Sequence, residues 1–232
     1  MRRLSRPFLI ALLLLLPLNA WSGDAAFVAR EQINFAHLLP PPPAVGSAVQ
    51  QEETALLLNL QKERTPAMEA FARADAERSV FRFADAVGAG FTAEKLPKTA
   101  AFFEKVKENA SALIGPAKRH WDRPRPYAST PEITPCVPKP GKASYPSGHS
   151  TFGTVDSIIL ANMLPEKAVQ IYERAEAYRF NREIGGVHYP SDVAAGRIAG
   201  TVIVAFMQQS PAFAEAYGAA RTELRQVLGL PQ

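Results

Sequence analysis

Apolar residues recur at steps of three and four positions through most of this 232-residue chain. That period is typical of α-helices with one buried face. The predicted helical stretches are 50–73 with a break near Pro66, 71–87, 102–117, 150–164, 166–183, 192–208 and 211–228. No stretch shows the strict alternation of a β-strand. We therefore expect an all-α fold, a single-domain helical bundle.

Prolines mark the segments that we expect not to be helical. The run Pro40–Pro43 forbids helix, so residues 37–43 should be extended, as part of a proline-rich N-terminal arm over residues 26–50. Pro124 should end the helix that precedes it. Residues 127–146 contain five prolines and predict a long loop. Loops of this length are usually functional or disordered.

The first 25 residues have the organisation of a secretory signal peptide. Three arginines among the first seven residues precede an apolar run from Phe8 to Leu18, and small residues follow it. A run of about 11 residues is shorter than the roughly 20 that a helix needs to cross a bilayer, which favours cleavage over an uncleaved anchor. We expect a signal peptide over residues 1–20, with its end open between residues 20 and 25, and export to the periplasm or the medium.

Composition excludes several classes of protein. A hydrophobic content of 47% is too high for a disordered chain. A single cysteine, Cys136, excludes an internal disulfide framework and a zinc site built on several thiolates, and it is interpreted as a loop thiol. Removal of three arginines with the signal peptide takes the net charge from +4 to +1, so no nucleic-acid partner is indicated. Asp156 and Arg197 interrupt the longest later apolar stretches, which predicts buried helices and no stable membrane insertion.

Chemistry-bearing residues concentrate in three short segments, of which the first to consider is Tyr145–Ser150. Pro146 restrains the entry, Gly148 lets the backbone approach a ligand, and an apolar helix follows. The unpaired N–H groups and the dipole at a helix start favour an anion. With the hydroxyl of Ser147 and the imidazole of His149 beside it, this turn predicts a phosphate cradle. An ordinary helix cap has the same Ser-Gly pattern, so the segment alone leaves both interpretations open.

A second segment, residues 181–192, ends one helix and begins another. His188 and Asp192 are four positions apart, so the carboxylate can bind one imidazole nitrogen and leave the other as a base or nucleophile. Arg182 reaches the same pocket if the Gly-Gly pair after it bends the chain. The structural alternative is a helix-terminal histidine with a carboxylate that faces solvent.

The third segment holds Lys118, Arg123 and Arg125 at the end of an apolar helix. Cations there also suit the helix dipole, so a solvated helix end is the structural alternative. The functional interpretation is a set of rigid donors for an oxyanion. His37 and His120 belong to no such constellation, and we interpret both as structural.

Together the segments match a known signature. The pattern is Lys118-x6-Arg125-Pro126, then Pro146-Ser147-Gly148-His149, then Arg182-x5-His188-x3-Asp192. It resembles the three-part signature of the type 2 phosphatidic acid phosphatase (PAP2) superfamily. Within it, the chain resembles the class A bacterial non-specific acid phosphatases, from the arm at residues 39–43 to residues 210–213. One departure is Asn181, where the signature usually has Ser; an amide can still donate a hydrogen bond, so we expect the site to survive.

The resemblance implies an acid phosphatase that spans residues 51–232. It would hydrolyse small phosphomonoesters through a phosphohistidine, at acidic pH, without metal or other cofactor. By position, His188 would be the nucleophile, Asp192 would orient it, and His149 would protonate the leaving alcohol and then help to activate water. The phosphoryl oxygens would be bound by Lys118, Arg125, Ser147, the Gly148 N–H and Arg182. Phosphoryl transfer needs mainly positioning and charge stabilisation, which fixed cations and a helix start provide. The same likeness favours a homo-oligomer.

Three alternatives use a similar site. A lipid phosphatase usually carries several membrane-spanning helices, and a vanadate-dependent haloperoxidase is typically a much longer chain. A non-catalytic phosphate-binding protein would not need both His149 and His188. We therefore expect a phosphomonoesterase.

Overall fold

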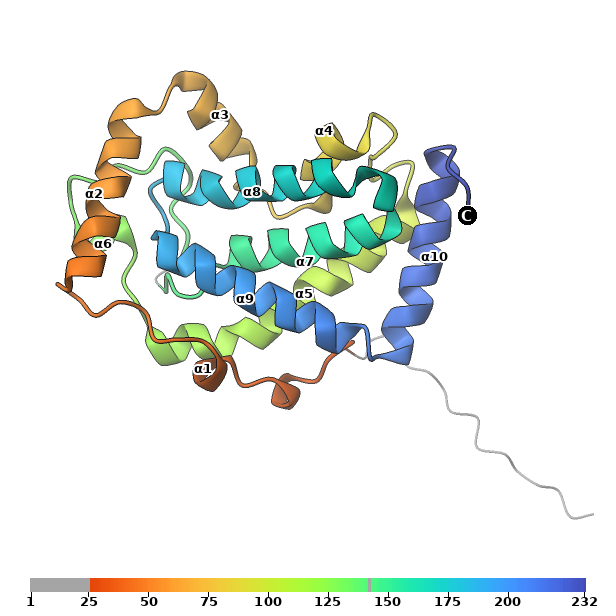
Figure 1. The fold of residues 1–232 in the computed structure, drawn as a ribbon, viewed down its shortest axis with the longest axis horizontal. Coiled ribbons are helices and arrows are strands. Elements are labelled where there is room, and N and C mark those ends of the chain that lie inside the picture. Colours follow the sequence, from red (N-terminus) through yellow and green to blue (C-terminus); the bar gives the residue numbers. More distant parts are fainter. Residues whose placement is uncertain (1–25, 142) are drawn as a thin grey trace, which may run out of the picture.

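The computed structural model describes residues 26–141 and 143–232, and within them the chain is helical without any strand (Figure 1). The helices are α1 (Phe35–Leu38), α2 (Ala48–Glu63), α3 (Pro66–Ala74), α4 (Ala84–Val87), α5 (Pro97–Trp121), α6 (Pro126–Ser129), α7 (Gly148–Met163), α8 (Ala168–Ile184), α9 (Pro190–Met207) and α10 (Pro211–Val227). Short 3-10 turns occupy Arg30–Gln32, Val80–Phe83 and Pro165–Lys167. The all-α prediction is confirmed; the expected signal peptide lies outside the described residues.

Local sequence signals explain where most helices begin. Proline occupies the first position of five helices, where its missing N–H costs no hydrogen bond. Side chains of Ser47, Thr65, Ser147 and Ser210 cap α2, α3, α7 and α10 by accepting a hydrogen bond from a backbone N–H in the first turn. The helices predicted after residue 100 are therefore present with ends shifted by a few residues.

Three local predictions are wrong at least in part. The loop expected over residues 127–146 begins with α6, which continues to Ser129. The expected helix over residues 71–87 stops at Ala74, because the buried carboxylate of Asp75 bonds to Arg82 and Arg174 and holds the chain in a turn before Val80. The extended backbone conformation expected over residues 37–43 begins only after Leu38. Residues 35–38 form α1 because the Asn34 side chain accepts a hydrogen bond from the N–H of Ala36.

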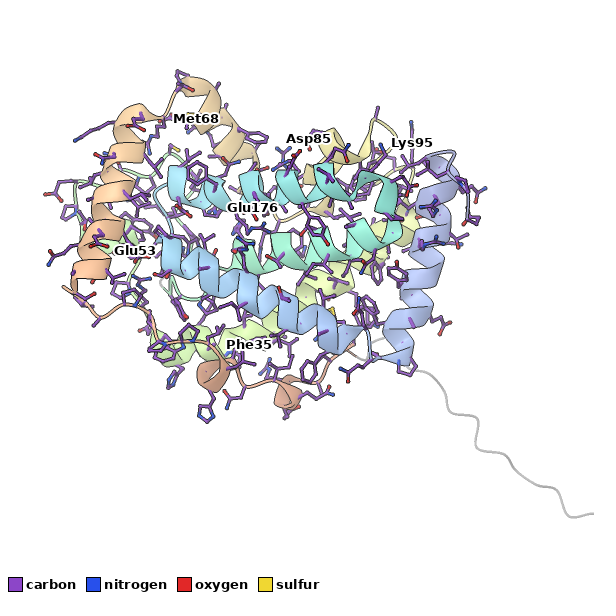
Figure 2. All side chains as sticks on the ribbon, in the orientation of Figure 1. Phe35, Glu53, Met68, Asp85, Lys95 and Glu176 are labelled. Carbon is purple, nitrogen blue, oxygen red and sulfur yellow. The ribbon has the colours of Figure 1, made fainter. Side chains whose placement is uncertain are left out.

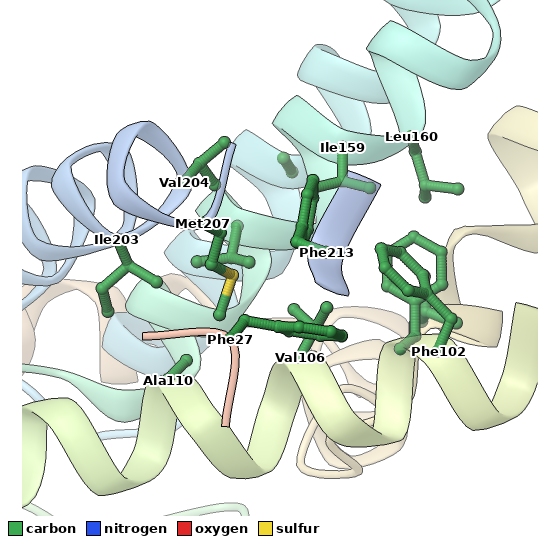
Figure 3. Packing of buried hydrophobic residues seen from close by; sticks show 14 of the residues in the cluster. Phe27, Phe102, Val106, Ala110, Ile159, Leu160, Ile203, Val204, Met207 and Phe213 are labelled. Atoms are coloured by element: carbon green, nitrogen blue, oxygen red, sulfur yellow. The ribbon is translucent and has the colours of Figure 1, made fainter. Parts of the chain in front are cut away.

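The main core lies between α5, α7, α9 and α10 (Figure 3). The predicted apolar stripe of α5 is buried along its whole length, from Phe102 through Val106 and Ala110 to Ala117. Phe27 of the N-terminal arm inserts between α5 and α10, where its ring meets that of Phe213 at 5.4 Å. The arm therefore packs against the helical bundle.

The path of the helices brings four of their ends together. α7 lies at the centre and packs against α5, α8 and α9. Successive long helices run in opposite directions, with α10 across one end of the bundle and α2 with α3 at the other (Figure 1). The C-terminal ends of α5 and α8 therefore meet the N-terminal ends of α7 and α9, beside α2.

Close packing of α9 on α7 locks this end of the bundle. A Cβ atom on Gly196 would lie 2.6 Å from the carbonyl oxygen of Ser147, and one on Gly200 would lie 2.7 Å from that of Thr151. Only glycine lets the two backbones approach so closely. The N–H of Ser147 donates to the carbonyl of Asp192 at 2.9 Å, which fixes the start of α9 against the start of α7.

α9 is also long and apolar enough to cross a membrane, the one such helix among the described residues. Half of that stretch is buried against the rest of the protein. The sequence predicted a buried helix here, and α9 packs against α5, α7 and α8.

Candidate active site

The three sequence segments meet at the end of the bundle where α5, α7, α8 and α9 converge. The expected site residues occupy the last turn of α5 (Lys118), the cap of α6 (Arg125), the start of α7 (Ser147, Gly148, His149), the last turn of α8 (Arg182) and the entry to α9 (His188, Asp192). Figure 2 shows Glu53 of α2 beside the first turn of α9, at the same end. The structure thus brings every expected site residue into one region.

His188 and Asp192 form a buried hydrogen-bonded pair. Nδ1 of His188 lies 3.3 Å from Oδ2 of Asp192, and both side chains are almost wholly buried. Burial raises the pKa of Asp192, but the hydrogen bonds from His188 and Ser144 and the charge of Arg123 outweigh it and lower the pKa to about 2. An ionised Asp192 accepts the Nδ1 proton of His188, so the lone pair of the ring is on Nε2.

Arg125 contacts that nitrogen. Its Nη1 lies 3.0 Å from Nε2 of His188 and also donates to the carbonyl of Val187 at 2.8 Å. Burial lowers the pKa of His188 to about 3, a trend that the bond to Asp192 opposes. His188 is therefore neutral, as a nucleophile must be, with a guanidinium beside the attacking atom.

Residues that the sequence interpretation did not assign support Asp192. Ser144 donates its hydroxyl to Oδ2 of Asp192 at 2.5 Å. Arg123 donates to Oδ1 at 2.7 Å, binds Glu53 of α2 at 2.9 Å, and stacks on the ring of Tyr189 at 4.1 Å. Arg123 was recognised only as one of three clustered cations. The partners come from distant parts of the chain, so no local spacing could have revealed them.

The predicted phosphate cradle is at the start of α7, where Ser147 is also a helix cap. Ser147 caps the helix, and its hydroxyl accepts from the N–H of Ser150 at 3.2 Å. A Cβ on Gly148 would stand 3.8 Å from Cε of Lys118, so the lysine runs beside this helix start. Burial, and secondarily the charge of Arg125, lower the pKa of Lys118 to about 7. Its ammonium donates to the carbonyl of Ala143 at 3.2 Å.

Arg182 carries hydrogen-bond donors that the protein does not satisfy. The residue is 1% exposed, and its Nε and Nη1 atoms have no hydrogen-bond partner. Burial lowers its pKa to about 10, which leaves the guanidinium charged. The bend after α8 is as predicted, with Gly186 in the left-handed region at φ 69°. Unsatisfied buried donors on a cation are costly, and an oxyanion satisfies them.

His149 is held by a backbone carbonyl. Its Nε2 lies 2.9 Å from the carbonyl oxygen of Ala76, so Nε2 carries a proton and Nδ1 is the other available nitrogen. Burial, followed by the charge of Arg182, holds the pKa of His149 well below its usual range, and the bond to Ala76 opposes this shift. The ring lies beside that of Tyr178, with centroids 6.1 Å apart.

Other sequence candidates lie elsewhere. His37 and His120 are exposed and lie outside the cluster. Cys136 is buried, and burial raises the pKa of its thiol, which suits the predicted unreactive role. Asn181 donates its amide to Asp75 at 2.7 Å.

A cavity of about 650 Å³ lies between α5 and the turn at residues 77–81. Its lining includes Arg78, Phe81, Lys107 and Phe152. Phe152 is one helical turn after His149, so the cavity lies next to the start of α7. No group of three or more His, Cys, Asp or Glu side chains that could hold a metal comes together in the described part of the chain.

Comparisons with known proteins agree with this geometry. Residues 109–214 match the model of the PAP2 superfamily. An acid phosphatase of Zymomonas mobilis is 32% identical over 80% of this chain and 74% of its own. Non-specific acid phosphatases of Salmonella typhi and Providencia stuartii are 32% and 30% identical, over 84% and 86% of this chain and 82% and 85% of theirs.

Similar solved structures support the fold. A bacterial vanadium-dependent iodoperoxidase aligns with a TM-score of 0.57 and 16% identity over 74% of this chain, which spans only 52% of that longer protein. A transmembrane PAP2-type phosphatidylglycerolphosphate phosphatase from Bacillus subtilis aligns with a TM-score of 0.53 and 20% identity, over 75% of this chain and 89% of that one. The helical fold is that of PAP2-type proteins. The chain belongs to the PAP2 superfamily, among the bacterial non-specific acid phosphatases, and is accordingly an enzyme of the acid phosphatase class.

Proposed function

We propose that the protein is an exported phosphomonoesterase that transfers the phosphoryl group of small organic phosphates to His188 and then to water. The observation that carries this proposal is the buried Asp192–His188–Arg125 arrangement. One imidazole nitrogen is fixed by a carboxylate, and the other lies 3.0 Å from a guanidinium. A neutral nucleophile is therefore adjacent to a donor for the phosphoryl oxygens.

In the first step the phosphoryl group binds among the cations of Lys118, Arg125 and Arg182, with the Ser147 hydroxyl and the Gly148 N–H as further donors. Nη1 of Arg125 passes its hydrogen bond from Nε2 of His188 to a phosphoryl oxygen, and the released Nε2 lone pair forms a bond to phosphorus while the ester P–O bond breaks. His149 gives a proton to the departing alkoxide, and the alcohol leaves toward the cavity beside Phe152. Asp192 stabilises the positive charge that develops on His188.

In the second step water attacks the phosphohistidine. His149, now neutral, takes a proton from the water, the N–P bond breaks, and inorganic phosphate forms. The electron pair of that bond returns to Nε2 of His188. Fixed cations stabilise the charge on the three equatorial oxygens in both steps.

The protonation of His149 depends on the substrate. Its pKa is lowered by burial and by the charge of Arg182, so the imidazole is neutral in the free protein. A bound phosphate offsets that positive charge and raises the pKa. Below pH of about 6 phosphate monoesters also carry a proton of their own. This supports activity on the acidic side of neutrality.

Metal independence and export complete the proposal. The donors around the phosphoryl position are cations, imidazoles and a hydroxyl, and none is a preferred ligand set for magnesium. Export is supported by the basic and apolar pattern of residues 1–18 and by the likeness to bacterial non-specific acid phosphatases.

Trapping the phosphoenzyme tests the histidine roles. The purified protein is mixed with nitrophenyl phosphate labelled in the phosphoryl group and quenched within milliseconds in alkali, where phosphohistidine is stable. We expect no labelled protein from His188→Ala. His149→Ala should retain label from nitrophenyl phosphate, because nitrophenolate leaves without a proton, but should lose about 10²- to 10⁴-fold in turnover of an alkyl phosphate. Asp192→Asn should fall between these variants.

His120→Ala is the matched control, because that histidine is exposed and lies outside the cluster. It should label as the unmodified protein does. Label on His188→Ala together with none on His149→Ala would reverse the two roles and overturn the assignment.

A further inference from the structure

Asp75 is the centre of a buried ionic cluster beside the active site. Its carboxylate is wholly buried. Arg174 of α8 binds it through two nitrogens, at 2.6 Å to Oδ1 and 2.9 Å to Oδ2. Arg82 adds a bond to Oδ1 at 3.0 Å, and the amide of Asn181 adds one to Oδ2 at 2.7 Å. Four charge-assisted hydrogen bonds therefore fix one side chain on the turn after α3.

The same turn carries the carbonyl that holds His149. Ala76 directly follows Asp75, and its oxygen lies 2.9 Å from Nε2 of His149. The next carbonyl, that of Glu77, accepts from the hydroxyl of Tyr178 at 2.9 Å. Bonds on both sides of Ala76 thus determine where its oxygen points.

One face of α8 supplies most of these bonds. Arg174, Tyr178 and Asn181 are spaced by four and three positions, so they line one side of the helix. Arg174 also stacks on the ring of Phe71, 4.6 Å from its centroid. The residue after Asn181 is Arg182, with its unsatisfied donors. A single helical face therefore sets the position of the Ala76 carbonyl and presents a cation to the phosphoryl group.

We propose that Asp75 is a positioning residue of the phosphatase reaction. With Arg174, Arg82 and Asn181 it fixes the Ala76 carbonyl, which accepts from Nε2–H of His149 and leaves Nδ1 as the nitrogen that is protonated when the ring serves as the acid for the leaving oxygen. Asp75 itself does not touch substrate. This assignment rests on the proposed role of His149 as proton donor, and it gives Asn181 a function through Asp75 instead of through phosphate.

Leaving-group dependence separates this role from a purely structural one. The variants are Asp75→Asn and the milder Asn181→Ala, compared on nitrophenyl phosphate and on an alkyl phosphate such as glycerol phosphate. General acid assistance contributes about 10²- to 10⁴-fold, and a misaligned donor loses part of it. We expect kcat/KM, which reports only the steps up to formation of the phosphohistidine, to fall by about tenfold or more on the alkyl phosphate and by less than about threefold on nitrophenyl phosphate. The inhibition constant of inorganic phosphate should not change, because the cations remain.

Two controls keep the test decisive. Asn181→Ser keeps a short hydrogen-bonding side chain and should restore more of the alkyl phosphate activity than Asn181→Ala. Thr99→Ala removes a buried hydroxyl that bonds to Glu223 at 2.8 Å, far from His149, so it should lower stability without a leaving-group effect. If Asp75→Asn does not fold, Asn181→Ala carries the same comparison.

A double-mutant cycle distinguishes failure of this inference from failure of the proposed function. In the His149→Ala background, Asp75→Asn should cause no further loss on the alkyl phosphate, because its effect acts through His149. Equal losses on both substrates, or a full additional loss in that background, would overturn the positioning role. If His149→Ala itself shows no leaving-group dependence, the proposed function fails first.

Discussion

The pKa of Lys118 predicts how the enzyme responds to alkali. Burial, together with the charge of Arg125, lowers this pKa from 10.5 to about 7 in the free protein. Below that pH the ammonium is charged and can bind a phosphoryl oxygen, and above it the charge is lost. The value of kcat/KM reports the free enzyme, so it should fall about tenfold per pH unit above pH 7. A fall caused by the ionisation of the substrate is the same for the unmodified protein and for a Lys118 variant, so the ratio of their kcat/KM values isolates the charge of Lys118.

The variant Lys118→Met gives this prediction a magnitude. A hydrogen bond from a charged group contributes about 1.5 to 3 kcal/mol, or about 10- to 150-fold in kcat/KM. We expect a loss of that size at pH 5.5. At pH 8 only about a tenth of Lys118 is charged, so the loss should shrink about tenfold, and by pH 9 the two proteins should agree within about threefold. The curves therefore converge as the pH rises.

Initial rates from pH 5 to 9.5 provide the assay, with kcat and KM determined separately. Bound phosphate favours the charged lysine, so the fall in kcat should lie at higher pH than the fall in kcat/KM. Glu183 is the control, because burial and nearby carboxylates raise its pKa to about 7 as well. Glu183→Gln should keep the alkaline fall. If the fall persists in Lys118→Met and disappears in Glu183→Gln, the assignment to Lys118 is wrong.

Three further predictions follow from the site and the core. Phosphatase activity should survive prolonged chelation and be inhibited by vanadate; a loss in chelator that a divalent metal restores would contradict metal independence. N-terminal sequencing of protein from the periplasm or medium should begin after residue 20, whereas Met1 in a membrane fraction would indicate an anchor. Burial raises the pKa of Asp156, whose oxygens have no hydrogen-bond partner, so its ionisation in the unfolded chain reduces stability as pH rises above about 4. Asp156→Asn should therefore be more stabilising at pH 7 than at pH 4 in urea unfolding, and an equal effect at both would refute this.

The sequence alone predicted the parts of the site whose geometry is local. His188 and Asp192 meet because they are four positions apart at the start of a helix, and Ser147 and Gly148 are at a helix start because α7 begins there. Arg182 lies in the same region because the chain bends at Gly186, as the Gly-Gly pair indicated.

The supporting residues depend on how distant helices dock, and local patterns do not encode that. Glu53 reaches Arg123 only because α2 packs beside the start of α9. Ser144 lies in the proline-rich loop, where no period indicated which side chain would face Asp192. The break at Asp75 was missed for the same reason. The apolar pattern around it resembles a helix, whereas its arginine partners lie 7 and 99 residues further along the chain.

The unpartnered guanidinium of Arg182 has a consequence for the working life of the enzyme. The fold holds Arg182 near the positive charge of Arg125, and this repulsion destabilises the folded state. The phosphate anion that relieves the repulsion is also the product of the reaction. Inorganic phosphate at a hundredfold excess over its dissociation constant would stabilise the folded state by about 2.7 kcal/mol. The same occupancy excludes substrate. Accumulated phosphate would therefore inhibit the enzyme while protecting it from unfolding. At low phosphate concentration turnover would be faster and the folded state less stable.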